Sequence, residues 1–449
     1  MMPSQRPPAT QRPHPLLIRL ALIVGLVLLG VRAAIASATF MAPGGAILGW
    51  STQQTATCTL CNVTIPKATP GHSLTPEEYA GILTSRLSLD QELGQMMMVQ
   101  VSGQGLSPDA IQMVNAQGAG GILFFAFNIQ SGSQIQSLTS QLQKIAPVPL
   151  LTSIDQEGGP VNRFYNLVGP LPSAASLTSP AQAQQQGQYD ATLLHRYGFN
   201  LNLAPVVDVG TKNPELQGRT FGSSPDRVAA MADAYLQGLQ QSGLVTGCIK
   251  HYPGLGGTAT DPHVGMPVLH STRAQWEDTD LAPYRTLLKS GDVHAILVSH
   301  EMIPEVDPNL PSSLSPTIVN GVLRQEMGYD GVVITDSLYM GALNQRWTVS
   351  EAIVLAVVAG ADIVIGPYNA QMVQDAKDAL KQAISNGTLT RARIDKSAQR
   401  ILALKIHMGL IPLPRQQPAP SPSPTSNPAT GNTGALIPTR QGASQVNGI

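Results

Sequence analysis

The sequence predicts a (β/α)8 barrel, an α/β fold resembling the TIM barrel. Short apolar runs recur along the chain, and helical segments separate them. Several runs lack polar alternation, which is typical of parallel strands buried on both faces. Eight such runs within about 290 residues suit eight successive β/α units. The runs lie at residues 96–101, 121–125, 150–155, 201–208, 245–250, 295–299, 332–336 and 362–365.

The helices between these runs carry their own signals. Thr75-Pro76-Glu77-Glu78 has the pattern of a capping box and predicts the start of the first helix. Residues 350–358 and 394–405 show helical spacing, and Gly409 suits the end of the last helix. The alternative is an open, doubly wound sheet. Its dinucleotide-binding form is disfavoured because no G-x-G-x-x-G follows the first run.

Both ends of the chain differ in composition from the barrel. Three arginines precede an apolar stretch at residues 20–31, and Ala36-Ser37-Ala38 fits a cleavage site. We therefore expect residues 1–38 to be a signal peptide or membrane anchor, and the protein to be exported, extracellular or bound at the cell surface. Residues 39–73 are interpreted as a linker, 74–411 as the barrel domain, and 412–449 as a disordered Pro/Ser/Thr-rich tail.

Composition excludes several classes of protein. The chain of 449 residues has a net charge of −1 and no long basic run, so we expect no nucleic-acid partner. A single long apolar run argues against a polytopic membrane protein. Three cysteines are too few for a disulfide scaffold, and Cys58-x-x-Cys61 lacks the second pair of a zinc site. We expect no metal and no other cofactor. The pattern specifies no oligomeric state.

Polar residues gather where the predicted strands end. A barrel places its active site at the carboxyl ends of its strands. One strand-end aspartate can simply cap the next helix, and Asp208 fits that interpretation as well as a functional one. Five strands that each end at polar or charged groups instead predict a shared site. These groups are Asp155, Glu157 and Arg163; Asp208 and Arg219; Lys250, His251, Asp261 and His263; Ser299, His300 and Glu301; and Thr335 and Asp336.

Six motifs resemble those of the glycoside hydrolase family 3 β-N-acetylhexosaminidases. They are "DQEGG", "APVVDV", "GRTFG", "KHYPG", "TDPH" and "GYDGVVITDSLYMGAL". They occur in the family's order and at compatible spacing, from about residue 77 to residue 410. The resemblance implies a retaining glycosidase on a single barrel. The β-glucosidases of the wider family place the acid/base in a second domain, for which the chain has no room after residue 410.

The resemblance also implies roles for individual residues. Asp336 matches the family's nucleophile, and His263, with Asp261 two residues before it, matches its acid/base pair. A retaining enzyme needs an ionised, rigidly held carboxylate, and a histidine can both donate and accept a proton near neutral pH. The positions that match the family's sugar-binding residues are Asp155, Arg163, Arg219, Lys250 and His251.

An alternative for Lys250 and Arg163 is a structural ion pair inside the barrel mouth, and both interpretations can hold together. The chain also departs from the family pattern. Pro160 replaces the arginine that usually follows "EGG", and Pro262 replaces the serine between Asp261 and His263. Leu255 and Gly257 remove two polar groups from the loop that usually reads "PGHGDT". These changes concern loop closure and leaving-group specificity.

The sequence thus predicts a retaining exo-β-N-acetylhexosaminidase that removes terminal N-acetylglucosamine from peptidoglycan fragments or chitin oligosaccharides. Only three tryptophans occur, which favours action on one terminal sugar. The alternatives are a β-glucosidase-like or phosphorolytic enzyme of the same family, and a non-catalytic wall-binding protein. A metal-dependent amidohydrolase would need H-x-H on the first strand, which reads "MMMVQV".

Overall fold

The computed structural model describes Leu60 and residues 74–414. The predicted signal segment, Cys58 and Cys61, and the tail beyond residue 414 lie outside the described residues, as does the predicted linker apart from Leu60. Within the described part of the chain, no helix combines the length and the apolar character that crossing a bilayer requires.

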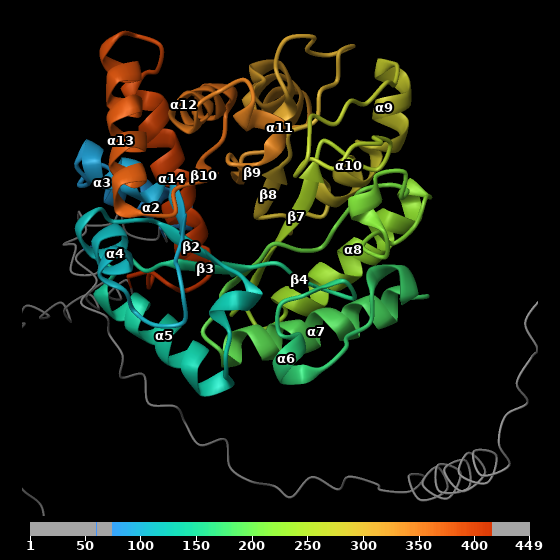
Figure 1. The fold of residues 1–449 in the computed structure, drawn as a ribbon, viewed down its shortest axis with the longest axis horizontal. Coiled ribbons are helices and arrows are strands. Elements are labelled where there is room, and N and C mark those ends of the chain that lie inside the picture. The colour runs from blue at the N-terminus through green and yellow to red at the C-terminus, as the bar shows by residue number, and fades with distance from the viewer. Residues whose placement is uncertain (1–59, 61–73, 415–449) are drawn as a thin grey trace, which may run out of the picture. The chain divides into compact units, whose positions relative to one another are not determined.

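Eight parallel strands close into a barrel in the order β1-β10-β9-β8-β7-β6-β3-β2, with helices arranged around them (Figure 1). Pairing of β1 with β10 closes the sheet, so the open-sheet alternative is wrong. Each predicted apolar run overlaps one strand, with β7 and β9 ending one or two residues beyond their runs, and the barrel prediction is confirmed. The strands are β1 Met97–Gln100, β2 Gly121–Phe124, β3 Leu151–Ile154, β6 Leu201–Asn202, β7 Thr246–Tyr252, β8 Ala295–Val298, β9 Val332–Ser337 and β10 Ile363–Ile365.

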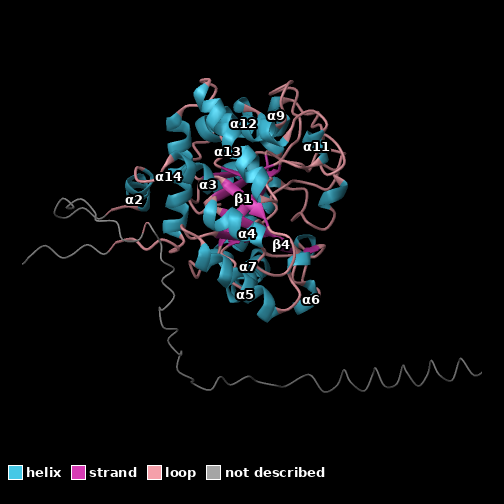
Figure 2. Cartoon of the chain, turned by 60° about the vertical axis from the view of Figure 1, so that its left-hand side comes forward, coloured by secondary structure: helices cyan, strands magenta, loops and turns pink. Residues whose placement is uncertain are grey.

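Helices follow most of the strands and enclose the barrel (Figure 2). The α-helices are α2 Pro76–Thr84, α3 Leu89–Gln95, α4 Pro108–Ile111, α5 Gly132–Ile145, α6 Tyr165–Val168, α7 Pro180–Arg196, α8 Pro225–Gln240, α9 Arg273–Thr279, α10 Ala282–Leu288, α11 Gly341–Asn344, α12 Val349–Ala359, α13 Ala370–Ser385 and α14 Arg391–His407. The 3-10 and π segments are η1 Gln112–Ala116, η2 Ala126–Asn128, η3 Ala174–Ser176, η4 Pro214–Leu216, η5 Ser312–Leu314 and η6 Thr317–Glu326.

The predicted helix signals are present in the structure. Thr75 caps α2, with its side chain accepting from the N–H of Glu78 and the Glu78 carboxylate accepting from the N–H of Thr75. The segment with helical spacing at 350–358 lies inside α12, and that at 394–405 lies inside α14. Gly409 follows α14 with a φ of 68°, a left-handed conformation that favours glycine.

A small antiparallel sheet that the sequence did not predict interrupts the barrel after β3. It consists of β4 Gln156–Gly158 and β5 Val161–Asn162. Gly158, the last residue of β4, and Gly159 in the turn have φ values of 81° and 52°, and a Cβ on Gly158 would lie 2.3 Å from the Pro172 carbonyl oxygen. Glycine is therefore required at Gly158, and the turn places Arg163 beside the end of β3.

The apolar strand residues and the inner faces of the helices form one continuous core. Cys248, on β7, is a buried free thiol in this core. A second, smaller cluster joins Leu60 to α2 and α14 through Tyr79, Leu83 and Leu402. Leu60 is buried in this cluster.

Candidate active site

A cavity of about 970 Å³ opens at the carboxyl ends of the strands. The structure brings all eight predicted site residues into its lining, although they come from four different strands, β3, β6, β7 and β9, and the loops that follow them. They are Asp155, Arg163, Arg219, Lys250, His251, Asp261, His263 and Asp336. This placement is what a barrel active site requires, and it leaves the role of each residue to be argued from its contacts.

Asp336 lies near the end of β9, inside a strand segment whose backbone is fixed by its neighbours in the barrel. The N–H of Ser337 donates to its Oδ1 at 2.7 Å. Burial alone would raise the pKa of Asp336, but His300, His251, the Ser337 amide and Lys250 together lower it below its ordinary value. The carboxylate is therefore ionised at neutral pH, as a nucleophile must be.

His300, which follows β8, holds part of this arrangement. Its Nδ1 lies 2.7 Å from the Ser313 hydroxyl and its Nε2 lies 3.0 Å from the Ser337 carbonyl oxygen. Burial lowers the pKa of His300 even though Asp336 opposes that shift. The sequence marked His300 as part of a polar strand end, but nothing in the pattern connected it to Asp336.

His263 and Asp261 form a close pair on the long loop after β7. His263 Nδ1 lies 2.8 Å from Asp261 Oδ1, and the His263 N–H donates to the same oxygen. The His263 side chain is 62% exposed and stands at the cavity mouth. Pro262 fits between them because proline has no backbone N–H and neither of these two contacts needs one. The Pro262 carbonyl oxygen accepts from the N–H of Ala342 at 3.0 Å.

The loop that carries His263 packs tightly against the start of α11. A Cβ on Gly341 would lie 2.4 Å from the His263 carbonyl oxygen, so only a glycine permits this approach. Because α11 follows β9 directly, the contact brings the His263 loop over the strand that bears Asp336. Both residues line the same cavity.

A network of buried charges forms one wall of the cavity. Lys250 Nζ contacts Asp155 Oδ1 at 2.5 Å and Glu157 Oε1 at 2.7 Å. Arg219 binds Glu157 through two nitrogens, at 2.7 and 2.8 Å. Arg163 lies 3.5 Å from Asp155. Lys250 and Arg163 thus share one carboxylate, as the structural interpretation predicts, and both also line the cavity.

Glu157 connects this network; the sequence placed it among the polar groups at the strand ends but assigned it no role of its own. Burial would raise the pKa of Glu157, but Lys250 and Arg219 lower it far below its ordinary value. Its position in the "DQEGG" motif was the available signal. What the sequence could not indicate is that one carboxylate is shared by two cations from separate loops.

His251 is oriented by Asp208. Its Nδ1 lies 2.7 Å from Asp208 Oδ2, and its Nε2 lies 3.3 Å from Arg219 Nη2. The other oxygen of Asp208 accepts from the N–H of Leu255 at 2.6 Å. Asp208 therefore fixes His251 and the following loop, and the N-cap of α8 is Ser224 instead. The interpretation of Asp208 as the cap of the next helix is therefore wrong.

In the loop after β7, Leu255 and Gly257 differ from the usual family pattern, and packing contacts accommodate both residues. Leu255 is buried in a small cluster with Val206 and Leu216. A Cβ on Gly257 would lie 2.7 Å from a methyl group of Leu269. The loop has exchanged polar groups for apolar contact, and it holds Asp261 and His263 at the cavity.

Glu215 is a further residue of the site that the sequence argument missed. The donor atoms of Glu215, Asp261 and His263 lie within 4.8 Å of one another, a spacing that could hold a metal ion. Burial and a hydrogen bond to Asp261 raise the pKa of Glu215 above its ordinary value. Asn213 ties this loop to the loop of Asp261 by donating to Thr258 and Thr260 at 2.8 Å.

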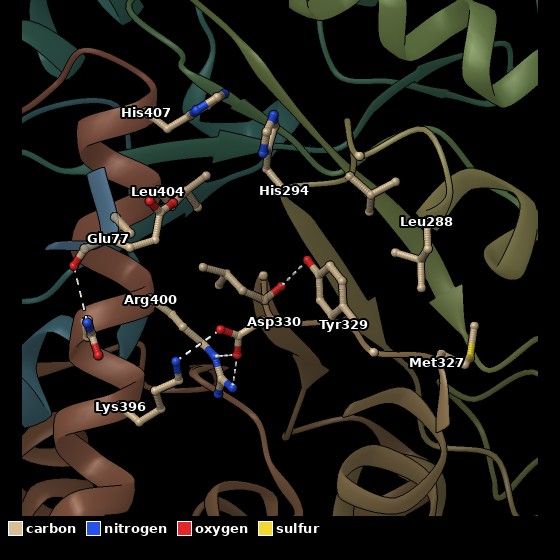
Figure 3. Close-up of a pocket in the computed structure, with 17 residues that line it drawn as sticks. Glu77, Leu288, His294, Met327, Tyr329, Asp330, Lys396, Arg400, Leu404 and His407 are labelled. Carbon is tan, nitrogen blue, oxygen red and sulfur yellow. Dashed lines mark hydrogen bonds and ion pairs between the residues drawn. The ribbon is translucent and has the colours of Figure 1, made fainter. Parts of the chain in front are cut away.

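A second cavity, of about 540 Å³, lies at the opposite end of the barrel (Figure 3). It is lined by residues that precede β8 and β9, among them His294 and Asp330. Asp330 is paired with Lys396 at 3.0 Å and Arg400 at 2.5 Å, and Figure 3 shows these groups pointing toward one another. The amino-terminal face of a barrel contributes mainly to stability, so we assign the chemistry to the first cavity.

Residues 88–404 match the family described as the glycosyl hydrolase family 3 N-terminal domain. The chain belongs to glycoside hydrolase family 3. It is 35% identical over 348 residues to the β-hexosaminidase LpqI of Mycobacterium tuberculosis. This match covers 73% of this chain and 85% of LpqI. It is 31% identical over 300 residues to a β-hexosaminidase of Xylella fastidiosa strain M23, covering 65% of this chain and 88% of the relative.

A solved structure of a family 3 β-N-acetylglucosaminidase from Paenibacillus superimposes with a TM-score of 0.69 at 34% identity. The match covers 76% of this chain and 66% of the Paenibacillus chain. The family match, the barrel fold and the cavity at the carboxyl ends of the strands all indicate the same class of enzyme. The chain is a glycoside hydrolase whose substrate is a carbohydrate.

Proposed function

We propose that this family 3 enzyme is a retaining exo-β-N-acetylhexosaminidase in which Asp336 is the nucleophile and His263 the acid/base. One observation carries the proposal: an ionised strand-end carboxylate and a histidine–carboxylate pair line the same cavity. The names of the β-hexosaminidase relatives support it.

In the first step, Asp336 attacks the anomeric carbon while protonated His263 gives its Nε2 proton to the leaving oxygen. The bond from the sugar to the leaving oxygen breaks, and a covalent glycosyl-aspartate forms. In the second step, neutral His263 takes a proton from water, and the water oxygen displaces Asp336. Asp261 accepts a hydrogen bond from Nδ1 throughout and stabilises the imidazolium when it forms.

The charged wall of the cavity suits the terminal sugar. Asp155, Glu157, Lys250 and Arg219 hold one another in place, so their remaining donors and acceptors are oriented before the sugar arrives. We propose β-linked N-acetylglucosamine in peptidoglycan fragments or chitin oligosaccharides as the substrate. The N-terminal segment, interpreted as a signal peptide or anchor, supports action outside the cytoplasm.

The test uses the purified chain with p-nitrophenyl N-acetyl-β-glucosaminide and the matching β-glucoside. We expect the glucosaminide to be cleaved with the higher kcat/KM, and NMR of the first product to show the β-anomer that retention requires. Faster cleavage of the glucoside, or an initial α-anomer, would contradict the proposal. Added phosphate tests the phosphorolytic alternative, since a sugar 1-phosphate would form in place of the free sugar.

A further inference from the structure

Two pairs of aromatic rings extend from the catalytic cavity to the surface of the barrel mouth. Phe125 and Phe127 are stacked, with ring centres 5.5 Å apart and planes 7° apart. Tyr339 and Tyr368 lie 5.1 Å apart. In each pair the first ring lines the cavity, and the second is exposed, Phe127 by 57% and Tyr368 by 50%.

The two pairs flank one sector of the mouth. Phe125 and Phe127 follow β2, Tyr339 follows β9 and Tyr368 follows β10. Around the barrel these strands run β9, β10, β1, β2, so β1 lies between the two pairs. Gln100, at the end of β1, lines the cavity, and its N–H donates to the Pro367 carbonyl oxygen beside Tyr368. The sector therefore leads outward from the cavity between two aromatic groups.

Hydrogen bonds fix the backbone beneath the first pair. The Asn128 side chain is buried and donates to the carbonyl oxygens of Val101 and Gly103, while its oxygen accepts from the Phe125 N–H. Gln104 donates to the Phe127 carbonyl oxygen at 3.3 Å. The exposed Phe127 ring thus stands on a turn tied to the β1 loop. Little ordering is needed before a ligand binds.

The chemistry of this sector selects a neutral ligand with apolar faces. Single exposed apolar residues are common and need no explanation, but these four rings are paired and continuous with the active site. None of the side chains Phe125, Phe127, Tyr339, Tyr368 and Gln100 is a carboxylate or a cation. Arg163 lies over Phe125 on the cavity side and is paired with Asp155. Sugar rings present C–H faces that stack on aromatic rings, with polar edges left in water.

We propose that Phe127 and Tyr368 form a platform for the sugars on the leaving-group side of the scissile bond, so that the preferred substrates are uncharged N-acetylglucosamine oligomers. This inference rests on the proposed function. It extends the expectation of action on one terminal sugar: the enzyme releases a single residue but binds the chain from which that residue is cut. The platform consists of phenylalanine and tyrosine side chains, whereas the expectation of a single bound sugar rested on the number of tryptophans alone.

The experiment compares N-acetylglucosamine oligomers of two, three and four units with methyl N-acetyl-β-glucosaminide, which has no ring beyond the scissile bond. In the wild type, kcat/KM should rise with chain length. In Phe127→Ala and Tyr368→Ala, the ratio of kcat/KM for the tetramer to that for the methyl glycoside should fall by about tenfold, from the loss of one aromatic contact. Tyr368→Phe keeps the ring and should keep the ratio.

Tyr189→Ala serves as the matched control, because Tyr189 is 43% exposed on α7 and lies outside the cavity lining. Its ratio should equal that of the wild type. An unchanged ratio in both platform variants, or a wild-type kcat/KM that is independent of chain length, would overturn the platform while the proposed function stands. Absence of cleavage of both the methyl glycoside and every oligomer would instead count against the proposed function itself.

Discussion

His263 Nδ1 and Asp261 Oδ1 lie 2.8 Å apart, and the backbone N–H of His263 donates to the same oxygen. Burial would raise the pKa of Asp261, but its hydrogen bonds with His263 and Glu215 lower it, so this oxygen is an ionised acceptor. Nδ1 therefore carries a proton and Nε2 is the nitrogen left for the substrate. The pair resembles the aspartate–histidine unit of a hydrolytic triad in its division of roles.

The first prediction concerns His263→Ala. Removing a general acid should reduce glycosylation by about 10²- to 10⁴-fold for glycosides with poor leaving groups, and much less for activated aryl glycosides. Asp261→Ala should show the same pattern more mildly, because the imidazole stays in place. A leaving-group series on both variants measures this. Equal losses across the series would assign His263 to binding and leave the proton donor to another group.

The second prediction concerns Asp336→Asn. The amide keeps the shape of the side chain but removes the attacking charge, so turnover should fall by about 10³-fold or more. Asp330→Asn, at the other end of the barrel, provides a control with the same change of charge and should retain activity. Near-normal turnover in a folded Asp336→Asn protein would contradict the assignment of the nucleophile.

The third prediction concerns Gly341→Ala. Its new Cβ would meet the His263 carbonyl oxygen at 2.4 Å, so the loop must move away from α11. Because a shift of about 1 Å can cost about 10²-fold in rate, we expect a fall in kcat with a small change in thermal stability. Gly321→Ala, where the nearest atom is 3.9 Å away, is the control. Equal kcat values for the two variants would show that the loop position is not critical.

The fourth prediction concerns Glu157→Gln. The change leaves Arg219 without its buried carboxylate and Lys250 with one fewer, and breaking such a buried pair costs about 3–5 kcal/mol. Urea unfolding should show this loss of stability. A separate binding measurement should show that the substrate binds more weakly. Glu277→Gln, which breaks a surface pair with Arg273, should cost less than about 1 kcal/mol. Similar losses in the two variants would mean that the wall contributes little to stability.

The sequence was sufficient for the barrel because its strands are buried on both faces, so each leaves a continuous apolar run that ends at a polar group. It was sufficient to place Asp336, His263 and Asp261 at one cavity because these residues sit in local motifs. It was not sufficient for the contacts of Glu157 or for Glu215, because their partners come from distant parts of the chain. The β4–β5 turn and the aromatic pairs also depend on how distant segments meet.

The last prediction concerns acid sensitivity at the opposite end of the barrel, where the rings of His294 and His407 lie 4.0 Å apart. Burial first, and then the charge of His407, lower the pKa of His294 to about 4 from 6.5, while Asp292 opposes the shift. Between these two values the unfolded chain binds a proton that the folded chain does not. The free energy of unfolding should therefore fall as the pH drops from about 6.5 to about 4.

The variant His294→Gln removes this titration, so its melting temperature should decline less over that interval. The control is His270→Gln, at an exposed position, and it should follow the wild type. Parallel melting curves for wild type and His294→Gln across this interval would show that His294 is not held neutral by the fold.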